Sequence, residues 1–326
     1  MKRFTWVAVL LCLFLLGGVL MGLALGPVRM DFHRVISALL LQGDAATRTL
    51  VWDLRAPRVA AALIAGACLG VAGHLLQNST RNPLGDPQLF GVGGGAAVAA
   101  ALSMAGILRV GTWGLFSLSV LASLACAAFI TFFASRRGLS PARMALIGVS
   151  LSALAAAIVT GILVGARVFG AQPLNFIGGS FANRGWSDVV PALPFLALGL
   201  LIALPVLGNM NVLGMGDQVA TNMGAEPART RAVAIAASGI LGGAAVAVAG
   251  LVGFVGLLVP HLSRLLVGHD VRPSFLISLL LGAVVMLYAD QVARLAFMPT
   301  EVPVGMISAV LGAPLMIYVA RRTRWN

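Results

Sequence analysis

The chain has 326 residues, of which 60% are hydrophobic and 10% are charged, and its formal net charge is +12 at pH 7. A soluble domain carries about 25% charged residues, so a water-exposed fold cannot hide this much apolar surface and lipid must cover part of it. Lysine occurs once, at Lys2. Because a Walker phosphate-binding loop needs a lysine after a glycine-rich turn, ATP-driven work by this chain would require an ATPase on another polypeptide.

Long uncharged stretches follow one another along the chain, and a helix needs about 20 apolar residues to cross a bilayer. The stretches are residues 4–28, 59–80, 87–108, 110–135, 144–166, 189–216, 232–263, 273–289 and 302–320. Residues 232–263 are too many for one span, and the glycines of this stretch together with Pro260 favour a break between a full helix and a short one. The sequence predicts an all-α polytopic membrane protein with about ten spanning helices, packed as one compact domain over residues 1–326.

The charged residues lie mostly between these stretches. If the N-terminus is cytoplasmic and the helices alternate, 13 of the 22 lysine and arginine residues lie inside and 9 lie outside. This direction agrees with the positive-inside rule. The outer arginines have two interpretations, contact with lipid headgroups or docking of an acidic soluble partner.

The first stretch extends to Val28, beyond the roughly 7–15 apolar residues of a signal peptide, so we expect it to form the first helix.

Glycines four residues apart predict faces along which helices pack closely, because small residues let two backbones approach. The pairs are Gly66 and Gly70, Gly91 and Gly95, Gly161 and Gly165, and Gly239 and Gly243. Such pairs indicate a compact bundle and carry no information about cargo.

The sequence has neither HExxH nor GxSxG, the motifs sought in an intramembrane enzyme. Cys12, Cys68 and Cys126 lie in separate apolar stretches, where a thiol behaves as a small hydrophobe. His74 and His261 have no partner at a ligand spacing, so we expect packing or loop hydrogen bonds for both. We therefore expect no catalytic residue, no metal and no cofactor bound by this chain.

Two acidic residues, Asp290 and Glu301, flank the outer end of the ninth predicted helix. Acidic groups at membrane depth cost about 2.5–3.5 kcal/mol on insertion scales, so they usually pair or serve a function. An ion-coupled secondary transporter of a small solute would use such a carboxylate near the middle of the membrane, and this is the alternative interpretation. Their position near a helix end favours pairing or docking.

Four groups of motif residues follow one another along the chain. The first is residues 54–58 with Gln77, 81–87 and 91–95, the second is 178–180 with Trp186, and the third is 220–224. The fourth is residues 253–264 and 268–272 with 289–294, 301–305 and 312–314. In this order they resemble the FecCD family, the permease subunits of binding-protein-dependent ABC importers for iron-siderophores, haem and cobalamin. The resemblance spans nearly the whole chain and implies a multi-pass permease of the bacterial inner membrane that passes one of these chelates.

The resemblance also implies the partners of such a permease. A cytoplasmic ATP-binding subunit in two copies would use the ATP, and a periplasmic or lipid-anchored substrate-binding protein would deliver the cargo. A second permease copy or a homologue would complete the translocation path. Besides these proteins we expect membrane lipid as a partner and no nucleic acid.

Arg55 and Arg58 lie three residues apart and so share one face of the first turn of a helix that can start at Pro57. Guanidinium groups bind carboxylates in two-pronged fashion. The resemblance implies that these arginines, together with Arg294, contact acidic residues on the two lobes of the binding protein. For Arg294 an ion pair with Asp290, four residues earlier, is an equal alternative.

The segment from Asn82 through Pro83 to Leu84 predicts a turn, because a residue before proline avoids helical geometry. The resemblance adds that Asn82 and Leu84 help form a cytoplasmic gate, as in the cobalamin importers of the family. The facing gate segment there carries small hydroxyl residues, whereas Pro141 and Ala142 stand at those positions here. This chain departs from the family at its gate.

Residues 209–231 are too hydrophilic to span the membrane. Asp217 is a candidate N-cap, Gly224 can end a short helix in left-handed geometry, and Glu226 with the following proline can start a second short helix. The resemblance implies two cytosolic coupling helices here that insert into a cleft of the ATPase, with Asp217, Ala220, Gly224 and Glu226 positioning them. An ordinary structured loop is the alternative.

Overall fold

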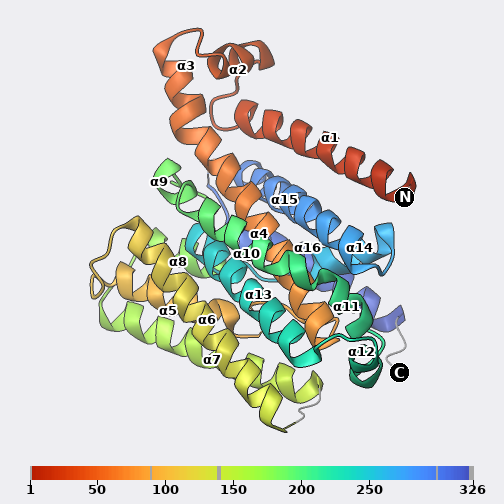
Figure 1. The fold of residues 1–326 in the computed structure, drawn as a ribbon. Coiled ribbons are helices and arrows are strands. Elements are labelled where there is room, and N and C mark those ends of the chain that lie inside the picture. Colours follow the sequence, from red (N-terminus) through yellow and green to blue (C-terminus); the bar gives the residue numbers. More distant parts are fainter. Residues whose placement is uncertain (1, 89, 138–140, 299, 323–326) are drawn as a thin grey trace.

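The computed structural model describes residues 2–88, 90–137, 141–298 and 300–322, and every regular element in these residues is a helix (Figure 1). The elements are α1 (Lys2–Ala24), α2 (Phe32–Leu39), α3 (Ala45–Thr49), η1 (Leu50–Arg55), α4 (Ala56–Thr80), α5 (Val92–Met104), α6 (Thr112–Arg137), α7 (Pro141–Gly165), α8 (Ala171–Gly178), α9 (Trp186–Val189), α10 (Ala192–Ala203), η2 (Leu204–Val206), α11 (Leu207–Leu213), α12 (Asp217–Asn222), α13 (Pro227–Ala249), α14 (Val255–Val267), α15 (Val271–Leu295) and α16 (Val304–Arg322). The all-α prediction is confirmed. Within the described ranges, 7 helical runs are long and apolar enough to span a membrane, and α5, α14 and α16 are shorter apolar helices. Together they agree with the predicted number of spans.

The centre of the bundle is α4, which packs against α15, α13, α14 and α10. Most of its residues are buried, because neighbouring helices surround it. A helix that is buried all round needs no polar face, and α4 accordingly has no amphipathic pattern. In Figure 1 it runs from the end of the molecule that holds α2 and α3 to the end that holds α11 and α12. Its first turn and its last turn therefore lie at opposite ends of the bundle.

Glycines allow the close packing of α4. A Cβ atom added at Gly66 would collide with the backbone of Gly282, and one added at Gly73 would collide with the backbone of Gly256. At Gly70 the obstacle would be the Ser278 carbonyl. The predicted packing face of Gly66 and Gly70 is therefore confirmed, and it faces α15.

The other glycine pairs divide into two groups. Gly243 approaches the backbone of Val120 in α6, as predicted, and Gly95 approaches the Ala122 carbonyl of the same helix. By contrast, nothing within the described chain lies within 4 Å of a Cβ added at Gly161 or Gly165. The predicted packing face on α7 is therefore wrong for contacts within this chain, because α7 lies at the edge of the bundle and packs mainly on α5.

The long apolar stretch 232–263 breaks between α13 and α14, as predicted. The break extends from Gly250, with φ of +75°, to Phe254, with φ of +69°. Pro260 lies inside α14 and not at the break, so its predicted part in the interruption is wrong. It stands in the second turn of α14, six residues after Phe254, where the missing N–H affects only the start of the helix.

The backbone at this break is hydrogen-bonded to the end of α8, which is in turn hydrogen-bonded to the start of α16. The bonds are Ser180 N to Ala249 O at 2.8 Å, Leu251 N to Phe176 O at 2.9 Å and Val304 N to Gly179 O at 2.8 Å. Non-helical backbone at membrane depth is tolerated only where the protein itself supplies such partners. The glycine motif 178–180 thus has a structural role at a junction of three segments.

We expect Gly73→Ala to destabilise the protein and Gly161→Ala to change its stability little. The added methyl group meets backbone at the first position and open space at the second, and overpacking typically costs about 1–3 kcal/mol. Thermal unfolding of the two purified variants in detergent measures the difference. Equal midpoints for both variants would contradict the close approach of α4 and α14.

Candidate functional site

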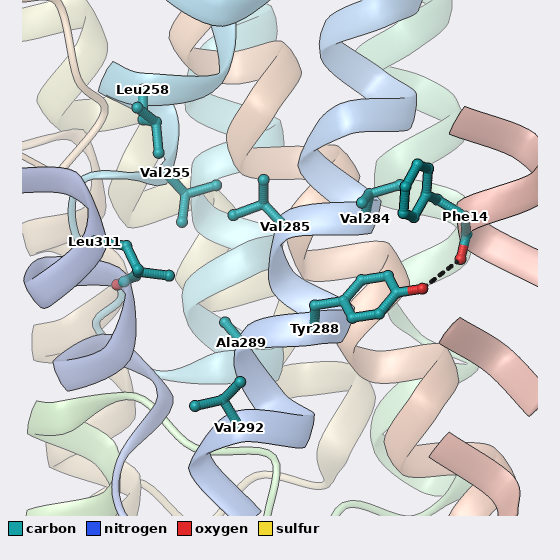
Figure 2. Close-up of a pocket in the computed structure, with 10 residues that line it drawn as sticks. Phe14, Val255, Leu258, Val284, Val285, Tyr288, Ala289, Val292 and Leu311 are labelled. Carbon is teal, nitrogen blue, oxygen red and sulfur yellow. Dashed lines mark hydrogen bonds between the residues drawn. The ribbon is translucent and has the colours of Figure 1, made fainter. Parts of the chain in front are cut away.

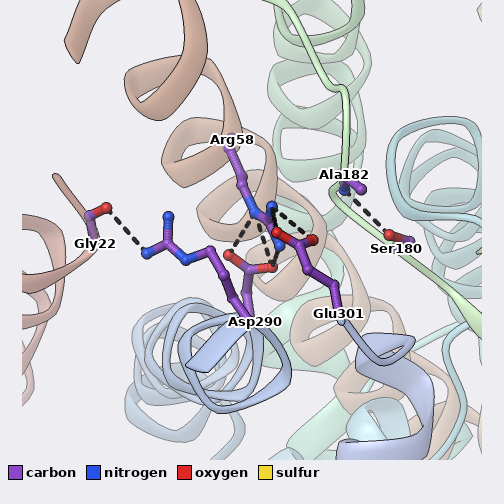
Figure 3. A network of polar contacts seen from close by, with 7 residues as sticks. Gly22, Arg58, Ser180, Ala182, Asp290 and Glu301 are labelled. Carbon is purple, nitrogen blue, oxygen red and sulfur yellow. Dashed lines mark hydrogen bonds and ion pairs between the residues drawn. The ribbon is translucent and has the colours of Figure 1, made fainter. Parts of the chain in front are cut away.

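Arg58, in the first turn of α4, binds two carboxylates at once (Figure 3). Its Nε lies 3.0 Å from Asp290 Oδ2, and its Nη2 lies 2.8 Å from Asp290 Oδ1. Its Nη1 lies 3.0 and 2.9 Å from the two oxygens of Glu301. The exposed fractions of the three side chains are 12% for Arg58, 4% for Asp290 and 35% for Glu301. Asp290 therefore holds the buried side of the guanidinium and Glu301 holds the side that faces solvent.

Asp290 and Glu301 are thus both paired with Arg58. Their position near a helix end favoured such pairing, and this prediction is confirmed. An arginine side chain does not lose its proton in a protein. Neither Asp290 nor Glu301 is therefore free to bind and release a coupling ion in this arrangement. The alternative ion pair between Asp290 and Arg294 is not among the ion pairs of the described residues, because Arg58 takes Asp290 instead.

Arg55 is 5% exposed and binds backbone carbonyls at the end of α1. Its Nη1 donates to Leu23 O at 2.6 Å and to Ala24 O at 2.9 Å, and its Nη2 donates to Val28 O. The last carbonyls of a helix have no partner within that helix. Arg55 supplies a donor to Leu23 O and a second donor to Ala24 O, which also accepts from Met30 N at 3.1 Å. Arg55 and Arg58 therefore contact different elements, although they are one turn apart.

Side chains on one face of α15 bind carbonyls along α1, and we call these three bonds the α1–α15 row. They are Tyr288 Oη to Phe14 O at 3.1 Å, Gln291 Nε2 to Gly18 O at 2.6 Å and Arg294 Nη2 to Gly22 O at 3.1 Å. Gly18 and Gly22 let α15 approach α1 closely. Like Arg55, Arg294 is 5% exposed. Docking of a partner by Arg55 and Arg294 stays a prediction, and a partner would reach them only after α1 moved.

A cavity of about 320 Å³ lies beside the α1–α15 row, between α1, α14, α15 and α16 (Figure 2). Apolar side chains such as Val255, Val285 and Leu311 line it, and its polar lining groups are Tyr288 and Ser308. No charged side chain is among its lining residues. The cavity therefore lacks the groups that would hold a charged chelate.

The predicted gate segment after α4 forms a turn. The helix ends at Thr80, and Arg81 has a left-handed φ of +50°. The Asn82 Oδ1 accepts a hydrogen bond from Leu84 N at 3.0 Å, which is the local side-chain bond expected of asparagine in a turn. Asn82 is 8% exposed, whereas Leu84 is 46% exposed. The turn is confirmed, and it leaves Leu84 as the residue that can meet another surface.

The facing gate segment lies only partly in the described chain. Residues 138–140 are outside the described residues, and α7 begins at Pro141. Proline suits the first position of a helix, where no internal hydrogen bond is lost. The assignment of Pro141 to a gate stays a prediction.

Asp217 joins three elements at the end of the bundle that holds α11 and α12. It is the first residue of α12 and Gly216 is the N-cap, so the predicted N-cap role of Asp217 is wrong. Its carboxylate instead binds Arg231 of α13 at 2.7 and 2.8 Å, and it also binds Arg81. Arg231 donates in addition to Ser79 O at 3.1 Å. The Asp217 cluster, which is Asp217 with Arg81 and Arg231, therefore connects α12 to α13 and to the gate turn.

The electrostatics of the Asp217 cluster favour the ionised acid. The hydrogen bond from Arg231, with the positive charges of Arg231 and Arg81, holds the pKa of Asp217 below its usual value. Charge-assisted hydrogen bonds of this kind are stronger than neutral ones. The cluster is partly exposed, so solvent and salt weaken it.

The other predicted coupling residues have distinct positions. Ala220 is fully buried and packs α12 onto the protein, so it does not face a partner. Gly224 has φ of +81° and ends the turn after α12, which confirms the predicted left-handed geometry. Glu226 is exposed and lies 3.5 Å from Arg229.

The prediction of a second short helix from residue 227 is wrong. Glu226 is the N-cap and Pro227 is the first residue of α13, which continues to Ala249 as a spanning helix. The second short helix of this region is α11, which precedes α12. Apolar residues continue after Arg231 without a turn signal, and this explains why the helix does not stop.

Sequence reasoning missed Arg81 and Arg231 as partners of Asp217, and Tyr288 and Gln291 as partners of α1. The spacing of Tyr288, Gln291 and Arg294 by three residues places them on one helix face, so the sequence did contain a signal for this row.

His74 packs as predicted, with its Nδ1 3.3 Å from Ser278 Oγ. Within the described residues no group of three or more His, Cys, Asp and Glu side chains could hold a metal.

Residues 11–322 match the model of the FecCD transport family. The chain belongs to this family. A related FecCD-type permease, the Fe(3+)-citrate import system permease protein YfmD of Bacillus subtilis, is 33% identical over 318 residues, which cover 98% of this chain and 94% of that protein. The iron(3+)-hydroxamate import system permease protein FhuB of Bacillus subtilis is 37% identical over 323 residues, which cover 96% of this chain and 82% of that protein.

Solved structures agree with the FecCD assignment. An inward-facing ABC transporter described as of metal-chelate type has a TM-score of 0.80 and 28% sequence identity, and the match covers 96% of this chain and 98% of that chain. The chain is therefore a multi-pass membrane protein of a transport family. These similarities favour the permease interpretation over the ion-coupled carrier.

We expect Asp217→Asn to lower thermal stability at pH 7 and to have a progressively smaller effect as the pH falls below about 3.9. The pKa of Asp217 is lowered by folding, so the ion pairs stabilise the protein above the pKa of the unfolded state, about 3.9, and this stabilisation is lost as pH falls through the folded value. Unfolding midpoints of both proteins across this pH range measure it. Asp53→Asn, at an exposed outer position, is the control, and a midpoint difference that did not shrink in acid would contradict the assignment.

Proposed function

We propose that this chain is the permease subunit of a binding-protein-dependent ABC importer that carries a ferric siderophore-type chelate across the bacterial inner membrane. The proposal rests on the FecCD match over nearly the whole chain and on relatives that are named for ferric citrate and ferric hydroxamate. Haem and cobalamin are the other cargo classes implied by the family resemblance. The single lysine, Lys2, assigns ATP hydrolysis to a separate subunit.

The geometry that supports this proposal is the placement of charged clusters at the two ends of α4. Arg58 with its carboxylates lies at the outer end, and the Asp217 cluster lies at the other end. The helix between them has 25 residues, a length of about 37 Å at 1.5 Å per residue, which spans a bilayer. We assign the outer end to the substrate-binding protein and the cytoplasmic end to the ATP-binding subunit.

In this proposal the ATPase acts through α12. Closure of two ATP-binding subunits would move α12, and Asp217 would transmit the movement through Arg81 to the turn that carries Asn82 and Leu84. Leu84, which is exposed, would meet the segment that begins at Pro141 and close the path. The displacement therefore reaches the gate through one ion pair and one short turn.

A second permease copy or a homologue would complete the path. The open surfaces at Gly161 and Gly165 on α7 support this, since they have no neighbour within the described chain. On α16, the large apolar side chains Met306, Val310 and Leu311 are more than half exposed. Such faces are covered either by lipid or by another protein in a membrane.

Reconstitution tests the proposed function. We expect liposomes that contain this chain, its ATPase and its binding protein to take up a radiolabelled ferric siderophore. Uptake should occur only when ATP is present on the side of the membrane where the ATPase lies. Dissipation of ion gradients with ionophores should leave the rate unchanged, because neither Asp290 nor Glu301 couples an ion. Uptake that needed an ion gradient and no ATPase would reject the proposal.

Gly224→Val should uncouple ATP hydrolysis from uptake in the same liposomes. Gly224 has φ of +81° and open space beside it, so the cost of a side chain is backbone strain that a β-branched residue cannot avoid. Gly224→Asn is the matched control, because asparagine tolerates left-handed geometry. We expect the valine variant to insert normally and lose most uptake, whereas wild-type uptake by the valine variant would contradict a coupling role for this turn.

A further inference from the structure

Of the two carboxylates that bind Arg58, Glu301 is the one near solvent, with its side chain 35% exposed. We propose that Glu301 is an internal substitute for a carboxylate of the substrate-binding protein, and that docking replaces Glu301 on Arg58 with that carboxylate. This inference rests on the proposed function, because the incoming group belongs to the binding protein. It explains how an arginine that is already paired can also serve a partner.

The geometry separates a permanent carboxylate from an exchangeable one. Asp290 binds Nε and Nη2 of Arg58, which form one edge of the guanidinium. Glu301 binds through Nη1 alone, with both of its oxygens within 3.0 Å. A guanidinium offers several donors in a fixed plane, so one carboxylate can leave while the other stays.

The burial of the two carboxylates also indicates that Asp290 is the permanent partner of Arg58 and Glu301 the exchangeable one. The Asp290 side chain is 4% exposed and the Glu301 side chain is 35% exposed. Removing a partner from a buried charge is strongly destabilising, whereas a solvent-facing carboxylate regains water when it leaves. If Arg58 always keeps two carboxylates during the exchange, its buried charge is never left without a partner.

The backbone around Glu301 lets its side chain leave alone. Glu301 lies in the non-helical segment between α15 and α16. The residues after it are held by Val302 N to Ala293 O at 3.1 Å and by Val304 N to Gly179 O at 2.8 Å. Among the described residues the carboxylate of Glu301 is hydrogen-bonded to Arg58 alone. The release of Glu301 therefore breaks no backbone bond.

The surroundings attract an additional acid. The guanidinium groups of Arg55 and Arg294 bind backbone carbonyls and form no ion pair among the described residues, so no contacting carboxylate balances their positive charges. The Nε of Arg294 is buried and has no hydrogen-bond partner in the described structure. A partner surface with exposed glutamate or aspartate is complementary to this field, and such complementarity raises association rates.

Replacement of the internal carboxylate tests the exchange. We expect Glu301→Gln to bind the binding protein that supports uptake in the reconstitution with a Kd about three- to tenfold lower than wild type, because a neutral amide holds Arg58 more weakly than a carboxylate does. The gain should disappear in the double variant Arg58→Gln, Glu301→Gln. Asp44→Asn is the matched control, since it removes another outer carboxylate and asparagine still caps α3.

A second measurement leaves every charge in place. A spin label on Thr300→Cys, at the exposed position next to Glu301, should become more mobile when the binding protein docks. The exchange would be overturned if Glu301→Gln bound the binding protein as tightly as wild type or more weakly, or if the mobility of the spin label did not change. In each of these cases, docking of the binding protein by wild type would still support the proposed function. If wild type bound no binding protein, the docking part of the proposed function would fail as well.

Discussion

The structure depends on the contact of α4 with α15 and α14 at backbone distance. Gly66 faces Gly282 and Gly73 faces Gly256 at positions where one methyl group would collide with a neighbouring carbonyl. Lipid provides no hydrophobic force between helices, so close van der Waals packing must hold them together. Because α4 is fixed along its length, Arg58 at one end and Ser79 at the other have defined positions, and each end can be built into a site.

The two ends use charge in different ways. At the end that holds α2 and α3, the buried Arg55 and Arg294 bind carbonyls of α1, and Arg58 binds two carboxylates, one buried and one near solvent. At the other end, Asp217 is partly exposed and joins α12 to the turn after α4 through Arg81 and to α13 through Arg231. The Asp290 pair is therefore shielded from salt, whereas the Glu301 pair and the Asp217 cluster are partly exposed, weaker and open to rearrangement.

The sequence predicted the elements whose cause is local. Apolar length predicted the spanning helices, the glycines of residues 250–256 predicted the break, and Gly224 predicted a left-handed turn. The partners of charged groups were not predictable in this way. Arg58 meets Glu301 and Asp217 meets Arg81 across more than 100 residues, and helix spacing identifies only neighbours three or four residues apart. For the same reason Asp290 was assigned to Arg294 as an alternative, although it binds Arg58.

The central claim is that each end of α4 serves one partner, the binding protein outside and the ATPase inside. Photocrosslinking of the assembled transporter tests this most directly, with a benzophenone side chain at Leu54 on the outer end or at Val219 on α12, both of which are exposed. The account predicts that Leu54 crosslinks to the binding protein alone and Val219 to the ATPase alone. A crosslink from Val219 to the binding protein, or from Leu54 to the ATPase, would contradict it.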